Sequence, residues 1–170
     1  MKTIVAVDLN WGIGYKGSLL VKIPEDMSFF KKMTLGKVVI MGRETFESLP
    51  GKEPLEGRKN IILSRKEGYR DNRITICHTL DDIFDVIKEY NSDDVFVIGG
   101  ESVYKQLLPF CKEAYITKIE HRYDADKFFN DLDSNESWEL ASTSDLKTYK
   151  GIKYRFTKYV NSKLLSENCG

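Results

Sequence analysis

Four short runs of apolar, mostly β-branched residues recur along the N-terminal part of the chain, at residues 4–7, 38–41, 60–63 and 95–98. Each run is almost continuously apolar, which is typical of a strand that is covered on both faces. A strand with one face in water would alternate apolar and polar residues instead. Since helical patterns lie between the runs, we expect an α/β fold with parallel strands and helices packed on the sheet.

Two of the intervening segments carry signals for the start of a helix. Pro24 stands near a first helical position, where its missing N–H costs nothing. The second start is at Thr79, followed three residues later by Asp82 in the manner of a capping box. The apolar stripe behind it consists of Leu80, Ile83, Phe84 and Ile87. Such a stripe predicts a helix face that packs into the core rather than a site.

The pattern changes after Pro109. Residues 115–120 and the alternating residues 152–157 predict strands with one wet face, and Lys150-Gly151 predicts a turn before the last strand. We therefore expect a mixed sheet, parallel early in the chain and antiparallel late. No linker or repeat interrupts the chain, so we expect one domain over residues 1–160 and a short tail over residues 161–170.

Composition narrows the classes of function. The 26 Lys and Arg residues balance the 26 Asp and Glu residues, and no basic block alternates with aromatics, so we expect no nucleic-acid partner. The three cysteines form no CxxC pair and the two histidines lie far apart, so we expect a reducing compartment and no metal site. The apolar run at the N-terminus is too short for a signal peptide or a membrane span. These features predict a cytoplasmic protein without membrane attachment.

Asp26 is an acid on an apolar helix face. Helical spacing places Phe29, Phe30 and Met33 on the same side of the helix as Asp26. An acid there either caps the first turn of the helix or waits for a ligand to pair with it. The segment alone leaves both interpretations open.

Two strand-to-helix junctions share a glycine. The strand 38–41 runs into Gly42-Arg43, and the strand 95–98 runs into Gly99-Gly100. A glycine before a helix lets backbone N–H groups approach a phosphate, to which Arg43 would add a positive charge. The alternative is a tight turn that needs glycine for its backbone angles alone. Together, at the ends of neighbouring strands, the junctions favour a phosphate-binding crevice.

Two further basic residues stand at the ends of the third strand. After it, Ser64 and Arg65 offer the hydroxyl and guanidinium that a 2′-phosphate needs, which favours NADP over NAD. Before it, Arg58 offers a bidentate clamp for a carboxylate. A solvent-exposed basic strand end is the alternative interpretation of both.

Residues 12–17 match the pattern G-x-G-x-x-G of dinucleotide-binding folds. That pattern requires a helix to open at once and an acid to close the next strand, and neither follows here. We therefore expect a flexible glycine-rich loop that covers a site, with Leu19 and Leu20 as lid contacts.

In order and spacing, these features resemble the dihydrofolate reductase family. The matching motifs are residues 13–14, 24–27, 39–48, 57–64 and 97–100, Tyr104, and residues 115–117. The resemblance covers nearly all of the chain up to about Tyr159. It implies a central mixed, mostly parallel sheet of about eight strands with helices on both faces. It also implies NADPH-dependent reduction of 7,8-dihydrofolate to 5,6,7,8-tetrahydrofolate for one-carbon and thymidylate metabolism, and antifolate inhibitors as ligands of a monomer.

The resemblance also implies roles for single residues. For catalysis it implies Asp26, Thr117 and, in the lid, Leu19. Substrate binding falls to Ile4, Val5, Asp26, Met27, Phe30, Leu49, Leu55, Arg58, Ile98 and Thr117. Cofactor binding falls to Ala6, Ile13, Gly14, Gly17, Ser18, Gly42, Arg43, Glu44, Thr45, Leu63, Ser64, Arg65, His78, Ile98, Gly99, Gly100, Glu101, Ser102, Val103 and Tyr104.

The chain departs from many family members at two places. Val21 and Lys22 replace a tryptophan and an asparagine beside the lid, which changes the hydration expected there. Glu101 and Ser102 replace a glycine and an arginine after the double glycine, which gives Arg43 and Arg65 more of the NADP preference. Two rival functions are the pyrimidine reductase of riboflavin synthesis and a non-catalytic nucleotide-binding module. Neither has a use for both Asp26 and the Arg58 clamp.

Overall fold

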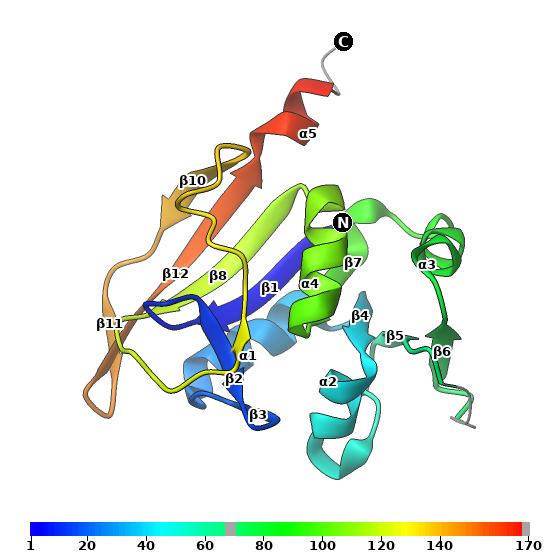
Figure 1. The fold of residues 1–170 in the computed structure, drawn as a ribbon, viewed down its shortest axis with the longest axis horizontal. Coiled ribbons are helices and arrows are strands. Elements are labelled where there is room, and N and C mark those ends of the chain that lie inside the picture. The colour runs from blue at the N-terminus through cyan, green and yellow to red at the C-terminus, as the bar shows by residue number, and fades with distance from the viewer. Residues whose placement is uncertain (67–70, 168–170) are drawn as a thin grey trace.

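The structure is a computed structural model that describes residues 1–66 and 71–167. Its main sheet has nine strands, in the order β10-β12-β8-β1-β7-β4-β5-β6, with β11 paired to β12 (Figure 1). The strands of this sheet are β1 (Lys2–Val7), β4 (Val38–Gly42), β5 (Lys59–Leu63), β6 (Ile74–Cys77), β7 (Val95–Gly99), β8 (Glu113–Ile119), β10 (Trp138–Thr143), β11 (Lys147–Tyr149) and β12 (Ile152–Asn161). The helices are α1 (Pro24–Thr34), α2 (Arg43–Ser48), α3 (Leu80–Ile87), α4 (Glu101–Leu107) and α5 (Ser162–Glu167). Short 3₁₀ helices are found at η1 (Pro50–Lys52), η2 (Ser92–Asp94) and η3 (Leu108–Phe110).

The sheet is mixed, as expected. From β8 to β6 the neighbouring strands are all parallel. The strands formed late in the chain are antiparallel, because β12 runs against β8, β10 and β11. The division of the sheet into an early parallel part and a late antiparallel part is therefore confirmed.

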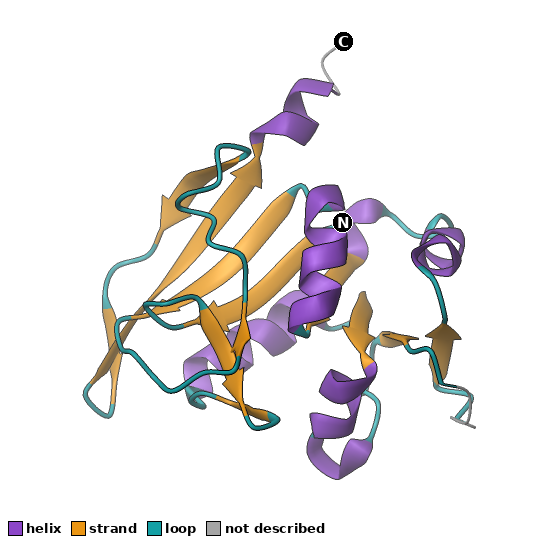
Figure 2. Cartoon of the chain, in the orientation of Figure 1, coloured by secondary structure: helices purple, strands orange, loops and turns teal. Residues whose placement is uncertain are grey.

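Helices cover both faces of the sheet (Figure 2). Alternate residues of β4 show why: Val38 and Ile40 pack in the cluster that includes α3 and α4 residues, whereas Val39 and Met41 pack with Phe46 of α2. Since both sets are fully covered, the strand has no wet face and its sequence is continuously apolar. In the described part of the chain, no helix is long and apolar enough to cross a membrane.

The predicted elements are found close to their expected bounds. Helix α1 begins at Pro24, and α3 is capped by a reciprocal pair of hydrogen bonds between Thr79 and Asp82. Lys150 and Gly151 form the turn between β11 and β12, both with positive φ. The last strand reaches Asn161, one residue beyond the expected end of the domain, and α5 follows at once. The division at residue 160 stays a prediction.

The glycine-rich segment after β1 is not the plain loop that we expected. It forms a hairpin of β2 (Gly12–Tyr15) and β3 (Ser18–Leu19), and β2 also pairs with the distant β9 (Lys127–Phe128). Lys16 and Gly17 make the tight turn, and both have positive φ. No helix opens directly after the glycines, because β3 comes next and α1 begins only at Pro24, so the rejection of the G-x-G-x-x-G pattern is confirmed.

Candidate active site

Asp26 lies in the first turn of α1, against the middle of β8. The hydroxyl of Thr117 donates a hydrogen bond to Asp26 Oδ1 over 2.5 Å. Thr117 is buried, and its side chain points to the α1 face of the sheet, where Phe29 also packs its ring against Phe156 at 4.7 Å. Asp26, predicted to lie on an apolar helix face, therefore packs among apolar side chains and has the Thr117 hydroxyl as its hydrogen-bond partner.

Burial raises the pKa of Asp26, and the hydrogen bond from Thr117 lowers it by less. Among the described residues, Asp26 Oδ2 receives no hydrogen bond. A half-buried carboxylate with one free oxygen gains most from a ligand that offers two N–H donors in a plane. The site thus favours a guanidine-like edge on its ligand.

The apolar residues expected to bind the substrate come from four separate parts of the chain. Leu49 and Leu55, from the segment after α2, and Ile98 of β7 pack together against one small core cluster. Met27 is 50% exposed on α1, so its side chain is open to a ligand. The other apolar residues assigned to this slot are buried or half-buried: Ile4, Val5, Phe30, Leu49, Leu55 and Ile98. Ala6, which was assigned to the cofactor, is half-buried on β1.

Arg58 stands at the other end of α1. Its Nη1 donates to the hydroxyl of Thr34, at 3.2 Å, and its Nε donates to the backbone oxygen of Glu56, at 3.0 Å. The hydroxyl of Thr34 in turn donates to the Phe30 carbonyl. Thr34 is buried and was not expected to serve the site; only its place eight residues after Asp26, at the far end of the same helix, indicated it. These bonds hold the guanidinium in one orientation before any ligand arrives.

The spacing along α1 sets the length of ligand that the site can hold. Thr34 is eight residues after Asp26 along the helix, a rise of about 12 Å. A ligand that reaches both Asp26 and Arg58 therefore needs an N–H-rich edge at one end and an anionic group at the other.

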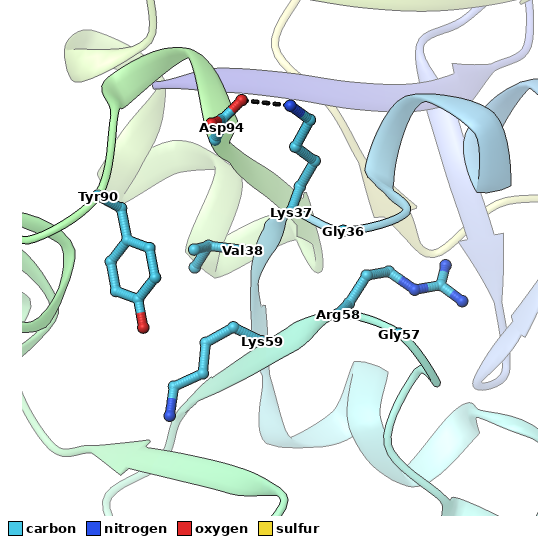
Figure 3. A pocket seen from close by; sticks show the side chains of 8 residues that line it. All are labelled: Gly36, Lys37, Val38, Gly57, Arg58, Lys59, Tyr90 and Asp94. Carbon is cyan, nitrogen blue, oxygen red and sulfur yellow. Dashed lines mark hydrogen bonds and ion pairs between the residues drawn. The ribbon is translucent and has the colours of Figure 1, made fainter.

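Arg58 also lines a hollow whose other residues are not among those expected to bind the substrate. Lys37, Lys59 and Tyr90 line it, and Lys37 is paired there with Asp94. Figure 3 shows the guanidinium of Arg58 directed away from the side chains of Lys59 and Tyr90. The hydrogen bond to Thr34 instead directs the guanidinium toward the end of α1.

The two glycine junctions lie side by side at the carboxyl ends of β4 and β7, as expected, because these strands are parallel neighbours. A Cβ on Gly42 would lie 3.1 Å from Val103, and a Cβ on Gly100 would lie 3.1 Å from Thr45 Oγ1. The backbone N–H groups there are not covered by side chains because glycine occupies these positions. Such a cradle fits a pyrophosphate, which needs close approach to backbone N–H groups.

Tyr104 supports this cradle from beneath. It is buried, and its hydroxyl donates to the Ile4 carbonyl over 2.9 Å, which joins α4 to β1. Its ring and hydroxyl lie 3.5 Å from the position of a Cβ on Gly99. Tyr104 therefore fixes the position of the double glycine relative to β1.

The residues at the ends of β5 and β6 are arranged differently from a simple 2′-phosphate site. Ser64 is buried, and its hydroxyl bonds the backbone of Lys66 both as donor and as acceptor. His78 Nδ1 lies 2.7 Å from the Ser64 carbonyl oxygen. Arg65 is exposed at the strand end. The turn already uses the Ser64 hydroxyl, so of the two residues assigned here Arg65, next to the exposed Lys66, is the one open to an anion.

Leu19, the residue expected to act as a lid, is in the hairpin after β1. It is 64% exposed at the end of β3 and lines a hollow with Tyr123 and Asp124. Glu101, one of the departures from the family pattern, connects α4 to the small sheet of β3, β2 and β9, because its carboxylate accepts a hydrogen bond from the N–H of Phe128 in β9. The same carboxylate forms an ion pair with Lys105. The other residues assigned to the cofactor are Ile13, Gly14, Gly17 and Ser18 in the hairpin, Leu63 at the end of β5, Arg43 and Glu44 at the start of α2, and Ser102 at the start of α4.

Comparison with known proteins points to one family. A family model described as dihydrofolate reductase matches residues 1–161. The dihydrofolate reductase of Bacillus subtilis is 36% identical over 140 residues, covering 82% of this chain and 80% of the relative. That of Neisseria gonorrhoeae is 35% identical over 157 residues, covering 92% of this chain and 95% of the relative.

A solved structure gives the same result for the fold. The dihydrofolate reductase from Enterococcus faecalis, complexed with NADP(H) and RAB-propyl, superposes with a TM-score of 0.82 at 30% sequence identity, and the match covers 94% of each chain. The mixed sheet with helices on both faces is thereby confirmed. On the family model, the relatives and the shared fold, the chain belongs to the dihydrofolate reductase family.

Proposed function

We propose that this chain reduces 7,8-dihydrofolate to 5,6,7,8-tetrahydrofolate with NADPH, and that Asp26, Thr117 and Arg58 hold the substrate. The product supplies one-carbon and thymidylate metabolism. The observation that carries the substrate assignment is the pair of polar anchors at the two ends of α1. Asp26 suits the 2-amino group and N3 of a pterin ring, and Arg58 suits the α-carboxylate of the glutamate tail.

The apolar slot between the anchors receives the rest of the substrate. Leu49, Leu55 and Ile98 offer half-buried side chains to the flat pterin and aminobenzoyl rings. Burial of aromatic surface there contributes affinity, and the two anchors contribute orientation. A substrate fixed at both ends cannot slide along the slot, which favours a single reactive geometry.

NADPH supplies, when bound, the hydride that reduces C6 of the pterin. Gly42, Gly99 and Gly100 would hold its pyrophosphate, and Arg43 and Arg65 would add positive charge. Asp26 holds the ring and favours its protonated form, and water admitted beside the hairpin of β2 and β3 delivers the proton to N5. Leu19 shields the site as this hairpin closes over it.

The activity is tested by following NADPH oxidation by the purified chain, with and without dihydrofolate. We expect oxidation that depends on dihydrofolate and stops when it is consumed. NADPH binding without this oxidation would contradict the proposal. Oxidation driven instead by the pyrimidine substrate of riboflavin synthesis would assign the chain to the rival reaction.

Arg58→Leu is expected to raise KM for dihydrofolate about tenfold while changing kcat little, since a charge-assisted bond to the tail is lost at a distance from the reacting atoms. Steady-state kinetics at varied dihydrofolate measure both constants. The matched control is Arg122→Leu, the same change at an exposed arginine outside the site. A fall in kcat with unchanged KM would show that Arg58 does not clamp the tail.

We further propose that the chain acts in the cytoplasm as a monomer, with residues 1–160 as its functional domain and with dihydrofolate and antifolates as its ligands. Its balanced charge, with 26 basic and 26 acidic side chains, gives no general attraction for nucleic acid.

A further inference from the structure

The first turn of α1 is attached to the sheet by more than Asp26. Ile23 precedes the helix in the N-cap position but gives it no side-chain cap. Ile23 is instead buried in a cluster with Ile119 and Tyr154. The start of the helix therefore depends on contacts with β8 and β12 for its position, because its own sequence does not fix it.

Two rows of residues cross these strands beneath the helix start. Lys147, Tyr154 and Ile119 are direct neighbours across β11, β12 and β8. Two residues along, on the same face, Phe156 pairs with Thr117. Thr117 bonds Asp26 from the second row, so the first row lies next to the catalytic carboxylate.

Glu25 is joined to the first row through both of its oxygens. Its Oε2 accepts from the Tyr154 hydroxyl over 2.6 Å, and its Oε1 accepts from Lys147 Nζ over 2.8 Å. Asp26, the next residue, accepts from Thr117. Consecutive residues of the first turn thus bond to two different rows, and together they fix both the position and the rotation of the turn.

We propose that Glu25, held by Tyr154 and Lys147, is a positioning residue for the reaction: it sets where the Asp26 carboxylate meets the pterin ring. The inference rests on the proposed function, because it assigns a role toward the same substrate. With Glu25 detached, the turn would keep the apolar contact of Ile23 and the Thr117 bond to Asp26. It would lose both hydrogen bonds to the first row, which fix its rotation.

The ion pair between Glu25 and Lys147 matters less for the position of the turn than the hydrogen bond from Tyr154 does. The Glu25 and Lys147 side chains are 51% and 36% exposed, and an ion pair at such a position contributes little to stability. Tyr154 is buried, and a hydroxyl inside the protein needs a partner. A bond from a rigid, buried phenol fixes geometry more firmly than one from a long exposed lysine.

The contact also keeps its protonation state through the neutral range. The bond from Lys147, and then that from Tyr154, lowers the pKa of Glu25. Burial, followed by the bond to Glu25, raises the pKa of Tyr154 to about 12. A pH profile near neutrality therefore reports on Asp26 and the substrate rather than on Glu25 or Tyr154.

The test measures kcat/KM for dihydrofolate across pH in Glu25→Ala, Glu25→Gln and Tyr154→Phe. In Glu25→Ala we expect kcat/KM to fall about tenfold, because a small misplacement of a catalytic group is costly. We also expect its alkaline limb to move to lower pH, since water reaching Asp26 reduces the burial that raises its pKa. Glu25→Gln keeps an acceptor for the Tyr154 hydroxyl and should stay within about twofold of the wild type. Tyr154→Phe should move the same limb in the same direction as Glu25→Ala.

Glu120→Ala is the matched control, because Glu120 is an exposed carboxylate paired with Arg155, and Arg155 is on the opposite face of β12 from Tyr154. It should leave the pH profile unchanged, and the Kd for NADPH should be unchanged in all four variants. A lower Tm for Glu25→Ala with an unmoved pH profile would overturn the proposal and leave a purely structural role. So would an equal loss in Glu25→Gln. If Glu25→Ala fails to fold, Tyr154→Phe decides by the same criterion.

Failure of the proposed function would be distinguished by the wild type. If the wild type does not oxidise NADPH with dihydrofolate, the Kd of a 2,4-diaminopyrimidine, which needs a correctly placed Asp26, replaces turnover as the readout. Weaker binding in Glu25→Ala than in Glu120→Ala would support the positioning role. Equal binding in the two would overturn it.

Discussion

Replacing Asp26 with asparagine is expected to lower kcat for dihydrofolate at neutral pH by about a hundredfold or more, the scale of a lost acid–base group. Asparagine is almost the same shape and can still accept the Thr117 hydrogen bond, so the slot should keep its form. The negative charge that favours a protonated pterin is lost. NADPH oxidation with saturating dihydrofolate, wild type beside variant, measures the effect.

Part of the lost activity should return in acid. The variant cannot favour protonation of the substrate, but at low pH the substrate arrives protonated from solution. The ratio of wild-type to variant kcat should therefore shrink steadily as pH falls. A ratio that stays constant across pH would show that Asp26 contributes shape rather than charge. Asp85→Asn, the same change at an exposed acid of α3, should have no effect at any pH.

The same substitution should make the ligand-free protein more stable at neutral pH. Because burial raises the pKa of Asp26 in the folded state, the unfolded chain releases this proton at a lower pH than the folded chain does. As pH rises from the unfolded pKa through the folded pKa, ionisation therefore favours unfolding. Asparagine removes that penalty, so its Tm should exceed that of the wild type at neutral pH and converge with it in acid. A site that trades stability for function behaves in this way.

What the sequence predicts well is local. Strands covered on both faces are continuously apolar, as in β4, and the capping box at Thr79 needs only four consecutive residues. The place of Asp26 on a helix face follows from spacing, as does the meeting of the two glycine junctions from the rule for parallel strands. Each of these features is determined either by residues close together in the sequence or by the order and direction of the strands.

What the sequence does not predict depends on partners far apart in the chain. The hairpin after β1 is a strand pair partly because β9, only two residues long, pairs with it from more than a hundred residues away. The bond of Arg58 to Thr34 and those of Glu25 to Tyr154 and Lys147 also join distant segments. A hydroxyl such as that of Ser64 can equally serve a ligand or its own turn, and only the folded backbone decides.

Gly99→Ala is expected to weaken NADPH binding roughly ten- to a hundredfold, corresponding to about 1–3 kcal/mol of backbone strain. Gly99 has φ of 131°, a conformation that side chains other than glycine rarely adopt. The new methyl would lie 3.4 Å from Thr45 Oγ1 and 3.5 Å from Tyr104, which is ordinary contact. Space is therefore not the obstacle. Alanine should instead turn the backbone and move the N–H groups of the cradle away from the pyrophosphate; titration of NADPH fluorescence measures the Kd.

Gly151→Ala separates strain at the cradle from strain anywhere in the chain. Gly151 also has positive φ, at 79°, and a Cβ there would meet nothing within 4 Å. This variant lies in the turn between β11 and β12, so it should lower Tm while leaving the Kd for NADPH unchanged. If both variants weakened NADPH binding equally, the loss would come from general destabilisation, and the double glycine would not be the cradle. If only Gly99→Ala weakens it, the backbone at the end of β7 holds the pyrophosphate, because the substitution adds no charge and removes no hydrogen-bonding side chain.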